Sequence, residues 1–235
     1  MRALVGTSGF AYKEWKGHFY PADMKPEGML RYYGERFGSV EINNTFYRMP
    51  TEKLLLQWAA QVPGDFRFVL KASQKITHRR RLKDAGEELS YFLRTATVLG
   101  KQLGPTLFQL PPNLKKDLPR LADFLALVPK TWRAAFEFRH ASWFEDDVYE
   151  ALRGHDAALV AADTDEEESS LRVPFVATAT WGYLRLRRAG YDDAALTEWA
   201  RRVTSQPWNE AYVFFKHEEA GAGPALARRF TDLCA

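Results

Sequence analysis

Short runs of β-branched and aromatic residues alternate with longer stretches of helical periodicity along the whole chain. Eight runs are typical of strands and cover residues 4–8, 40–46, 66–73, 106–110, 134–139, 157–163, 182–187 and 211–216. Helical spacing between them predicts helices over residues 29–37, 51–62, 85–103, 118–128, 146–153, 194–203 and 224–233. We expect Gly104 to cap the long helix over 85–103. Residues 165–179 have no strong periodicity, and we expect a loop there.

Eight strands that are nearly all followed by a helix indicate parallel βαβ units. A closed barrel accommodates eight such units, whereas an open, doubly wound sheet usually has fewer strands. The 235 residues match the length of about 250 that is usual for one barrel. No linker, internal repeat or low-complexity tract divides the chain. The sequence therefore predicts an α/β protein with one domain, residues 1–235, folded as a single (β/α)8 TIM barrel.

Polar and apolar residues occupy opposite phases of the two-residue alternation in several predicted strands. In the run 182–187, for example, Arg185 and Arg187 alternate with Leu184 and Leu186. Alternate residues of a barrel strand point inward, and the C-terminal strand ends carry the site. We therefore expect the polar phase to converge on the barrel axis. This phase consists of Glu41, Asn43, Lys71, Glu137, Arg139, Arg185, Arg187 and Lys216, to which Gln109 and Asp163 are added.

The converging charges comprise five cations and three carboxylates, which leaves a positive excess at the predicted barrel mouth. A positive field favours an anionic ligand such as a phosphate or a carboxylate. The alternative is an ion network in which the carboxylates neutralise the cations and fill the barrel. The net charge of the whole chain, +3, permits an acidic partner but is too small by itself to indicate nucleic acid.

The loop after the first strand begins with Gly6-Thr7-Ser8-Gly9, a run of small residues whose backbone N–H groups can bind an oxyanion. Thr7 and Ser8 are therefore candidate ligand-binding residues. The Gly-Lys-Ser/Thr ending of a P-loop is absent. Trp15 and Trp143 follow predicted strand ends, and both are candidates for stacking on a base or a sugar.

Seven motifs occur together over essentially the whole chain. They are Gly6-Thr7-Ser8-Gly9-Phe10 with Tyr12 and Trp15; Phe19-Tyr20-Pro21; Val40-Glu41-Ile42-Asn43 leading to Thr45-Phe46-Tyr47-Arg48 and Pro50; Phe68 with Lys71; Ile76-Thr77-His78; Leu107-Phe108-Gln109-Leu110-Pro111-Pro112; and Phe136-Glu137-Phe138-Arg139-His140 with Ser142-Trp143. As a set they resemble the YecE-like family, domain-of-unknown-function family 72 (DUF72). The resemblance implies a TIM barrel and implies no established reaction.

The chain differs from the family pattern in two places. The family commonly has Arg-x-His-Gly after strand seven, whereas Arg185-Leu186 is followed here by Arg187-Arg188. An Asn-Asn pair is common after strand eight, whereas this chain has Lys216-His217. Both differences add positive charge at the predicted mouth.

The first functional hypothesis is a protein that binds or acts on a phosphorylated or otherwise anionic small molecule. The catalytic candidates are Glu41, Lys71, Glu137 and Asp163. The ligand-binding candidates are Thr7, Ser8, Asn43, Tyr47, His78, Gln109, Arg139, Trp143, Arg185 and Lys216. Lys71 could form a Schiff base with a substrate, or it could simply pair with Glu41 or Glu137. Whether the protein is an enzyme is left open.

Two other functions are weighed against the first. The basic run His78-Arg79-Arg80-Arg81-Leu82-Lys83 lies beside the predicted mouth and could contact phosphates of a nucleic acid, as in a phosphodiesterase-like barrel. A non-catalytic sensor or scaffold that binds an anion would use the same cations as an enzyme. The sequence does not separate these functions.

Composition narrows the cofactors and the compartment. The chain has five histidines and no convincing metal-ligand spacing, so we predict a protein without a metal or other cofactor. A single cysteine, Cys234, cannot form an internal disulfide. The N-terminus lacks the apolar stretch of a signal peptide, and no apolar run approaches the ~20 residues of a membrane span. We expect a cytoplasmic protein without a membrane partner; its oligomeric state is left open.

Overall fold

The strands of the computed structural model, which describes residues 1–165 and 171–234, form two parallel sheets. One sheet has the order β1-β9-β8-β7 and the other has the order β2-β3-β4-β5-β6. The strands are β1 (Arg2–Thr7), β2 (Ser39–Ile42), β3 (Arg67–Lys71), β4 (Leu103–Gln109), β5 (Ala134–Glu137), β6 (Ala158–Leu159), β7 (Ala161–Asp163), β8 (Trp181–Leu186) and β9 (Glu210–Phe215). The α/β fold with parallel sheets is as the sequence predicts.

The edges of the two sheets adjoin in two places. A single residue, Val160, separates β6 from β7, and its amide donates to the carbonyl oxygen of Phe136 at 2.9 Å. This stretch of chain therefore pairs with β5 on one side and with β8 on the other. At the second place, Ser8 forms a parallel bridge with Glu41, and the Gly9 amide donates to the Glu41 carbonyl at 2.8 Å.

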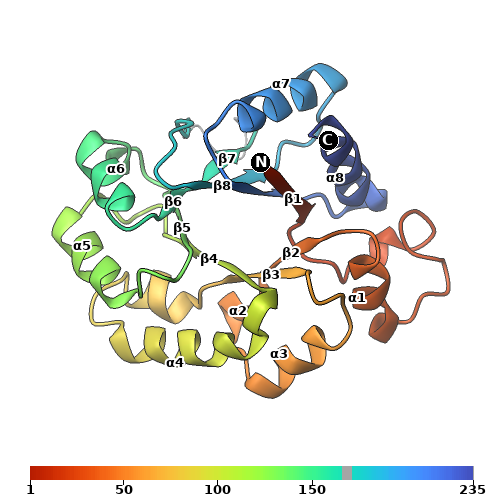
Figure 1. The fold of residues 1–235 in the computed structure, drawn as a ribbon, viewed down its shortest axis with the longest axis horizontal. Helices are drawn as coiled ribbons and strands as arrows, with labels where there is room; N and C mark the ends of the chain where they lie inside the picture. The colour runs from red at the N-terminus through yellow and green to blue at the C-terminus, as the bar shows by residue number, and fades with distance from the viewer. Residues whose placement is uncertain (166–170, 235) are drawn as a thin grey trace.

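Helices follow the strands and lie outside them, so that the strands occupy the centre of the view in Figure 1. Thr51, Asp117 and Asp192 cap three of the helices, because each side chain accepts a hydrogen bond from the backbone amide three residues on. The α-helices of the described residues are α1 (Pro26–Gly34), α2 (Asn44–Tyr47), α3 (Glu52–Ala59), α4 (Gly86–Ala96), α5 (Leu118–Leu127), α6 (Asp146–Arg153), α7 (Asp193–Thr204) and α8 (Ala222–Leu233). None of them is long and apolar enough to span a bilayer.

The buried apolar residues form two separate clusters, one on each face of the strands. Leu184 and Leu186 of β8 pack with the helices in the larger cluster. Tyr183, in the opposite phase, belongs to a smaller cluster that lies between the strands. The members of this inner cluster are Leu4, Val69, Leu107, Ala135, Ala158, Val160, Trp181, Tyr183, Tyr212 and Phe214. The predicted separation of the two strand phases, with Leu184 and Leu186 on the helix-facing side, is thus confirmed in β8.

Several predicted element boundaries are wrong, and two of them have a clear physical cause. The strand expected over 40–46 ends at Ile42, because the Thr45 hydroxyl donates to the carbonyls of Ile42 and Lys71 and the chain turns into α2. The helix expected over 85–103 becomes a 3₁₀ helix after Ala96, and a kink at Gly100, with φ of 52°, interrupts that segment.

Gly104 lies inside β4 and is not a helix cap. A Cβ atom at Gly104 would lie 3.1 Å from the Phe68 carbonyl oxygen, so the residue permits a close approach of β4 to β3. Of the loop expected over 165–179, residues 171–179 contain no helix or strand. The part over 166–170 lies outside the described residues.

We predict that Gly6→Ala destabilises the protein by more than ~2 kcal/mol, as expected for severe overpacking. A Cβ atom at Gly6 would overlap the backbone carbonyl oxygen of Ser39 and crowd the Tyr33 hydroxyl, where β1 passes β2. Urea unfolding measures the effect. Gly64→Ala is the matched control, because no atom lies within 4 Å of its added methyl group. Equal stabilities of the two variants would contradict the close packing of β1 on β2.

Candidate functional site

The C-terminal ends of the strands hold a buried arginine between two buried carboxylates. Arg185 of β8 donates from Nη2 to Glu41 Oε1 at 2.9 Å and from Nη1 to Glu137 Oε2 at 2.6 Å. The side chains of all three residues are no more than 2% exposed. Glu41 lies on β2 and Glu137 on β5, so Arg185 links the two sheets. We call these three residues the ion triad.

Neutral hydrogen-bond donors complete the surroundings of Glu41. The Ser8 hydroxyl donates to Oε1 at 2.7 Å, and the Tyr183 hydroxyl donates to Oε2 at 2.6 Å. Asn43 Nδ2 lies at 3.3 Å from Oε1. Burial alone would raise the pKa of Glu41, but Arg185 and these hydroxyl donors lower it overall. Glu41 is therefore an ionised anchor at neutral pH.

Glu137 is held in the same way by cations. Burial opposes its ionisation, but Arg185 and Arg139 hold the pKa of Glu137 far below its usual range. Arg139 Nε lies 2.6 Å from Oε1. Gln109 Nε2 donates to Oε2 at 2.9 Å, and its own Oε1 accepts from Lys71 Nζ at 2.8 Å. A continuous polar chain thus runs from Lys71 through Gln109 into the ion triad.

Lys71 has neutral neighbours where the sequence suggested a carboxylate. In the described part of the chain no ion pair joins Lys71 to Glu41 or Glu137, and its ammonium lies 4.2 Å from the ring centre of Phe46. The side chain is buried, with 9% of the residue exposed. Burial is the main cause that lowers the pKa of Lys71 to about 8, and the positive charge of Arg185 contributes in the same direction.

His78 follows β3, in a single π-helical turn (Lys75–Arg79). Its ring packs edge-on against Phe46, with 4.9 Å between ring centres, and Nδ1 is 2.9 Å from the Thr77 hydroxyl. Burial, followed by the charges of Lys71 and Arg139, lowers the pKa of His78. The imidazole is therefore neutral at pH 7.

Asp163 does not join the ion triad, contrary to the prediction. Its carboxylate accepts from the Tyr191 hydroxyl and from Trp199 Nε1, both at 3.0 Å, and pairs with Arg188 at 3.0 Å. The reason is strand phase: Ala161 packs in the helix-facing cluster, so Asp163, two residues further on, faces α7 as well.

The two tryptophans proposed for stacking are also misplaced by the sequence interpretation. Trp143 is fully buried, lies parallel to Phe138 at 4.6 Å and donates to the Leu114 carbonyl at 2.7 Å. Trp15 is fully buried and donates to the His217 carbonyl at 3.3 Å. Both indoles belong to the core and present no face to a ligand.

The backbone amides of the first loop are not available to an oxyanion either. The Thr7 amide donates to the Tyr33 hydroxyl, the Ser8 amide to the Phe215 carbonyl, and the Gly9 amide to the Glu41 carbonyl. The Thr7 hydroxyl also faces Tyr33, at 3.0 Å. Ser8 reaches the site only through its side chain.

Two other predicted residues are exposed. Tyr47 is 73% exposed and lines an open cavity of about 630 Å³ beside α3, together with Met49 and Leu54. Lys216 is exposed just beyond β9.

Tyr183 contacts Glu41 and Phe46 contacts Lys71, and the sequence analysis included neither residue among its site candidates. Tyr183 shares the strand phase of Arg185, so the alternation of β8 carried a signal for it. Phe46 was assigned to a strand, and only the turn into α2 brings its ring over Lys71.

Tyr12 lies close to Ser8 of this site. Its hydroxyl donates to the Ser8 carbonyl at 2.6 Å, and burial raises the pKa of Tyr12 to about 12. With Asn43 it lines a cavity of about 260 Å³.

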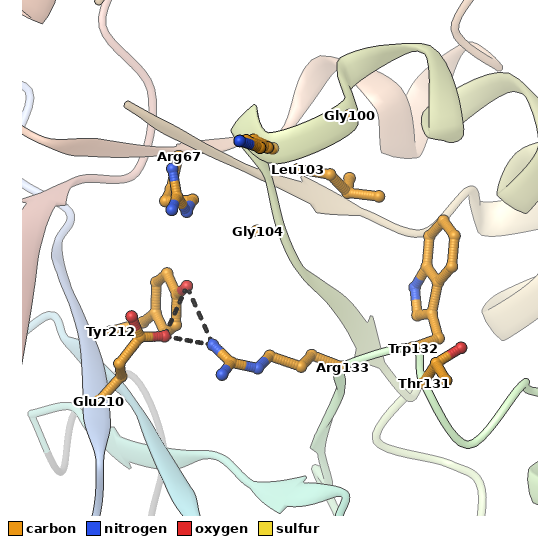
Figure 2. A pocket seen from close by; sticks show the side chains of 10 residues that line it. Arg67, Gly100, Leu103, Gly104, Thr131, Trp132, Arg133, Glu210 and Tyr212 are labelled. Atoms are coloured by element: carbon orange, nitrogen blue, oxygen red, sulfur yellow. Dashed lines mark hydrogen bonds and ion pairs between the residues drawn. The ribbon is translucent and has the colours of Figure 1, made fainter. Parts of the chain in front are cut away.

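A separate cavity of about 390 Å³ lies at the opposite, N-terminal ends of the strands (Figure 2). Figure 2 shows the side chains of Arg67 and Arg133 on different sides of Tyr212, with Glu210 next to Tyr212. Arg133 pairs with Glu210 and lies 3.4 Å from the Tyr212 hydroxyl. Its charge is thus balanced within the cavity wall.

This chain resembles known proteins in sequence and in structure. A family model described as a protein of unknown function, DUF72, matches residues 4–235. The curated relative UPF0759 protein YecE of Escherichia coli K12 is 32% identical over 116 residues, 49% of this chain and 43% of the relative. UPF0759 protein YunF of Bacillus subtilis is 28% identical over 156 residues, 62% of this chain and 54% of the relative. The matched region thus spans about half the length of these relatives.

Solved structures resemble nearly the whole chain. The crystal structure of a DUF72 family protein from Thermotoga maritima has a TM-score of 0.85 and 28% identity and covers 99% of both chains. A DUF72 family protein from Enterococcus faecalis has a TM-score of 0.78 and 20% identity, with 99% of this chain and 97% of the other covered. The second likeness is evidence for the fold alone.

We predict that Arg185→Met destabilises the protein by ~3–5 kcal/mol at pH 7, because two carboxylates are left buried without their cation. The loss should shrink as the pH falls. In the parent, the lowered pKa values of Glu41 and Glu137 mean that stability is lost as the pH falls through them. In the variant, protonation of Glu41 and Glu137 removes their unpaired buried charges. Acid therefore lowers the stability of the variant less than that of the parent. Urea unfolding at pH 7 and pH 4.5 measures both effects.

Arg201→Met is the matched control, because its pair with Glu198 is exposed at the surface. We expect its urea midpoint to match that of the parent at either pH. If Arg185→Met unfolds at the same urea concentration as this control, the ion triad does not hold the strands together.

Proposed function

For a chain that belongs to the DUF72 family of proteins of unknown function, we propose that the site binds or acts on a phosphorylated or otherwise anionic small molecule. We further propose that the two adjoining sheets act as one (β/α)8 barrel in a single domain. The hydrogen bonds at the two sheet junctions support this barrel, as does the separation of an inner cluster from the helix-facing one. The site then lies at the barrel mouth, the usual position in this fold.

The observation that carries the proposal is the local balance of charge. Three cations of the site act on Glu137 electrostatically, namely Arg185, Arg139 and Lys71. Only two carboxylates of the predicted set, Glu41 and Glu137, lie among them, because Asp163 pairs with Arg188 on the helix side. Three cations against two carboxylates leave a positive excess of one charge. Buried cations in excess favour an anionic ligand.

Arg139 is the group best placed to contact this ligand. It pairs with Glu137 through Nε, which leaves the two terminal nitrogens of its guanidinium to reach an anion. Its side chain is 22% exposed, whereas that of Arg185 is 2% exposed and fixed between two carboxylates. Arg185 thus sets the geometry of the site, and Arg139 is the more accessible of the two arginines.

The roles of the carboxylates in this proposal are structural. Glu41 and Glu137 accept several hydrogen bonds in ionised form, and their pKa values lie below the usual range. Neither is a proton donor near neutral pH. Among the catalytic candidates, Lys71 is the one whose pKa moves toward neutrality.

We predict that Arg139→Ala weakens binding of inorganic phosphate about tenfold or more. Such a loss corresponds to more than ~1.5 kcal/mol, the low end for a charge-assisted hydrogen bond. Titration of the ¹⁵N-labelled protein with phosphate at constant ionic strength, followed by NMR, measures the affinity. Urea unfolding of the same samples separates lost binding from lost stability.

Arg153→Ala, on the exposed surface of α6, is the matched control for the loss of one positive charge and should bind phosphate like the parent. Equal phosphate affinity of the Arg139→Ala variant and the parent would overturn the anion site and leave only a structural ion network.

A further inference from the structure

Lys71 differs from the other cations of the site in the kind of partner that it has. We propose that Lys71 is a nucleophilic amine that forms an imine with an aldehyde or ketone bearing an anionic group. This proposal rests on the proposed function, because the anionic group of the substrate would occupy the same cationic mouth.

The geometry around Lys71 positions its amine without fixing its charge. Its one hydrogen-bond acceptor in the described residues is the neutral amide oxygen of Gln109, at 2.8 Å. Gln109 is itself oriented by its bond to Glu137, so the amide cannot turn its NH₂ group toward Lys71 without losing that bond. The ring of Phe46 covers another side of the amine. A neutral amine keeps its lone pair in such a setting, whereas a carboxylate partner would hold the ammonium form.

The electrostatics act in the same direction as the geometry. Burial and the charge of Arg185 lower the pKa of Lys71 to about 8. About a tenth of the molecules then carry the neutral amine at pH 7, against roughly one in a thousand or fewer for an ordinary lysine. A lysine desolvated beside other cations is a common form of activated amine nucleophile.

The chemistry balances without an external oxidant or reductant. The amine attacks the carbonyl carbon, the C–N bond forms, and the oxygen of the former carbonyl takes a proton. Loss of this oxygen as water then gives the imine, so that amine and carbonyl yield imine and water. His78 is a neutral imidazole on the same aromatic ring, and it is suited to take the proton that the ammonium gives up and to return it to the departing oxygen.

The neighbouring Arg139 specifies the substrate class. Its guanidinium, beside the carboxylate that also holds Gln109, would bind a carboxylate or a phosphate carried by the carbonyl compound. The shared chemistry is a reactive carbonyl a short distance from an anion. A 2-oxo acid and a phosphorylated ketone both have it.

Reductive trapping tests this inference on the full-length chain. The protein is incubated separately with pyruvate and with dihydroxyacetone phosphate in the presence of cyanoborohydride, and labelled lysines are mapped by mass spectrometry. We expect Lys71 to be labelled at least tenfold faster than the exposed Lys130 by one or both probes. The probe that labels faster identifies the carboxylate or the phosphate as the preferred anion, and inorganic phosphate should slow the labelling.

Formaldehyde, which has no anionic group, separates amine reactivity from anion binding. We expect the rate of Lys71 methylation to rise with a midpoint near pH 8, and Arg139→Ala to shift this midpoint upward by removing one nearby cation. The same variant should lose its preference for the anionic probes, whereas Arg153→Ala should change neither property.

Labelling of Lys71 by both anionic probes no faster than that of Lys130 overturns the imine proposal. Phosphate binding that still depends on Arg139 in that case leaves the proposed function standing. If Arg139→Ala leaves both phosphate binding and anionic labelling unchanged, the anion site itself is wrong.

Discussion

The buried guanidinium of Arg185 between Glu41 and Glu137 is the interaction on which the rest of this structure depends. Taking three charges out of water costs several kcal/mol for each ion, and the attraction between them offsets this only when every polar atom has a partner. The chain meets most of this demand with hydroxyl and amide groups from four strands or their ends, among them Ser8, Tyr183 and Gln109. Within the described residues, Arg185 Nε stays buried without a hydrogen-bond partner. The result is a polar layer that joins both sheets at one end.

The same constraint determines which groups remain for chemistry. The two carboxylates are committed to Arg185, so the cations above them are left with a positive excess in a region of low dielectric. Lys71 is held by a neutral amide and Arg139 shares a carboxylate with Arg185. The ion triad thus stabilises the fold, and its Arg185 adds to the effect of burial in lowering the pKa of Lys71, whereas Glu41 and Glu137 oppose this shift. The positive excess above the triad is the basis of the proposed anion binding. Structure and the proposed function have one physical origin.

Much of this arrangement was predictable because strands packed on both faces alternate strictly with a period of two. Glu41, Glu137 and Arg185 were found in this way, since polar residues inside an otherwise apolar alternation have few other places to go. The prediction for Asp163 was wrong although the same rule applies to it. Asp163 follows Ala161 by two residues, and it therefore faces the helices as Ala161 does. Trp15, Trp143 and the amides of the first loop could not be assigned from pattern, because their hydrogen-bond partners are distant in sequence. The position of Phe46 required the turn into α2, which depends on a hydroxyl bond to the end of β3.

The charged residues at the two ends of the strands differ in how deeply they are buried. This difference matters more for their effect on neighbouring groups than the number of charges does. At the N-terminal end, Arg133 is 43% exposed and pairs directly with Glu210, so solvent screens its charge and the carboxylate neutralises it. At the C-terminal end, Arg185 is 2% exposed and acts on Lys71 through protein instead of water. A cation shifts the proton equilibrium of its neighbour strongly only when water is excluded between them. The closed apolar layer of inner residues beneath the ion triad, such as Val69 and Phe214, provides that exclusion on one side. A ligand seated over Arg139 would provide it on the other, so binding of an anionic substrate and exclusion of water from Lys71 would be one event.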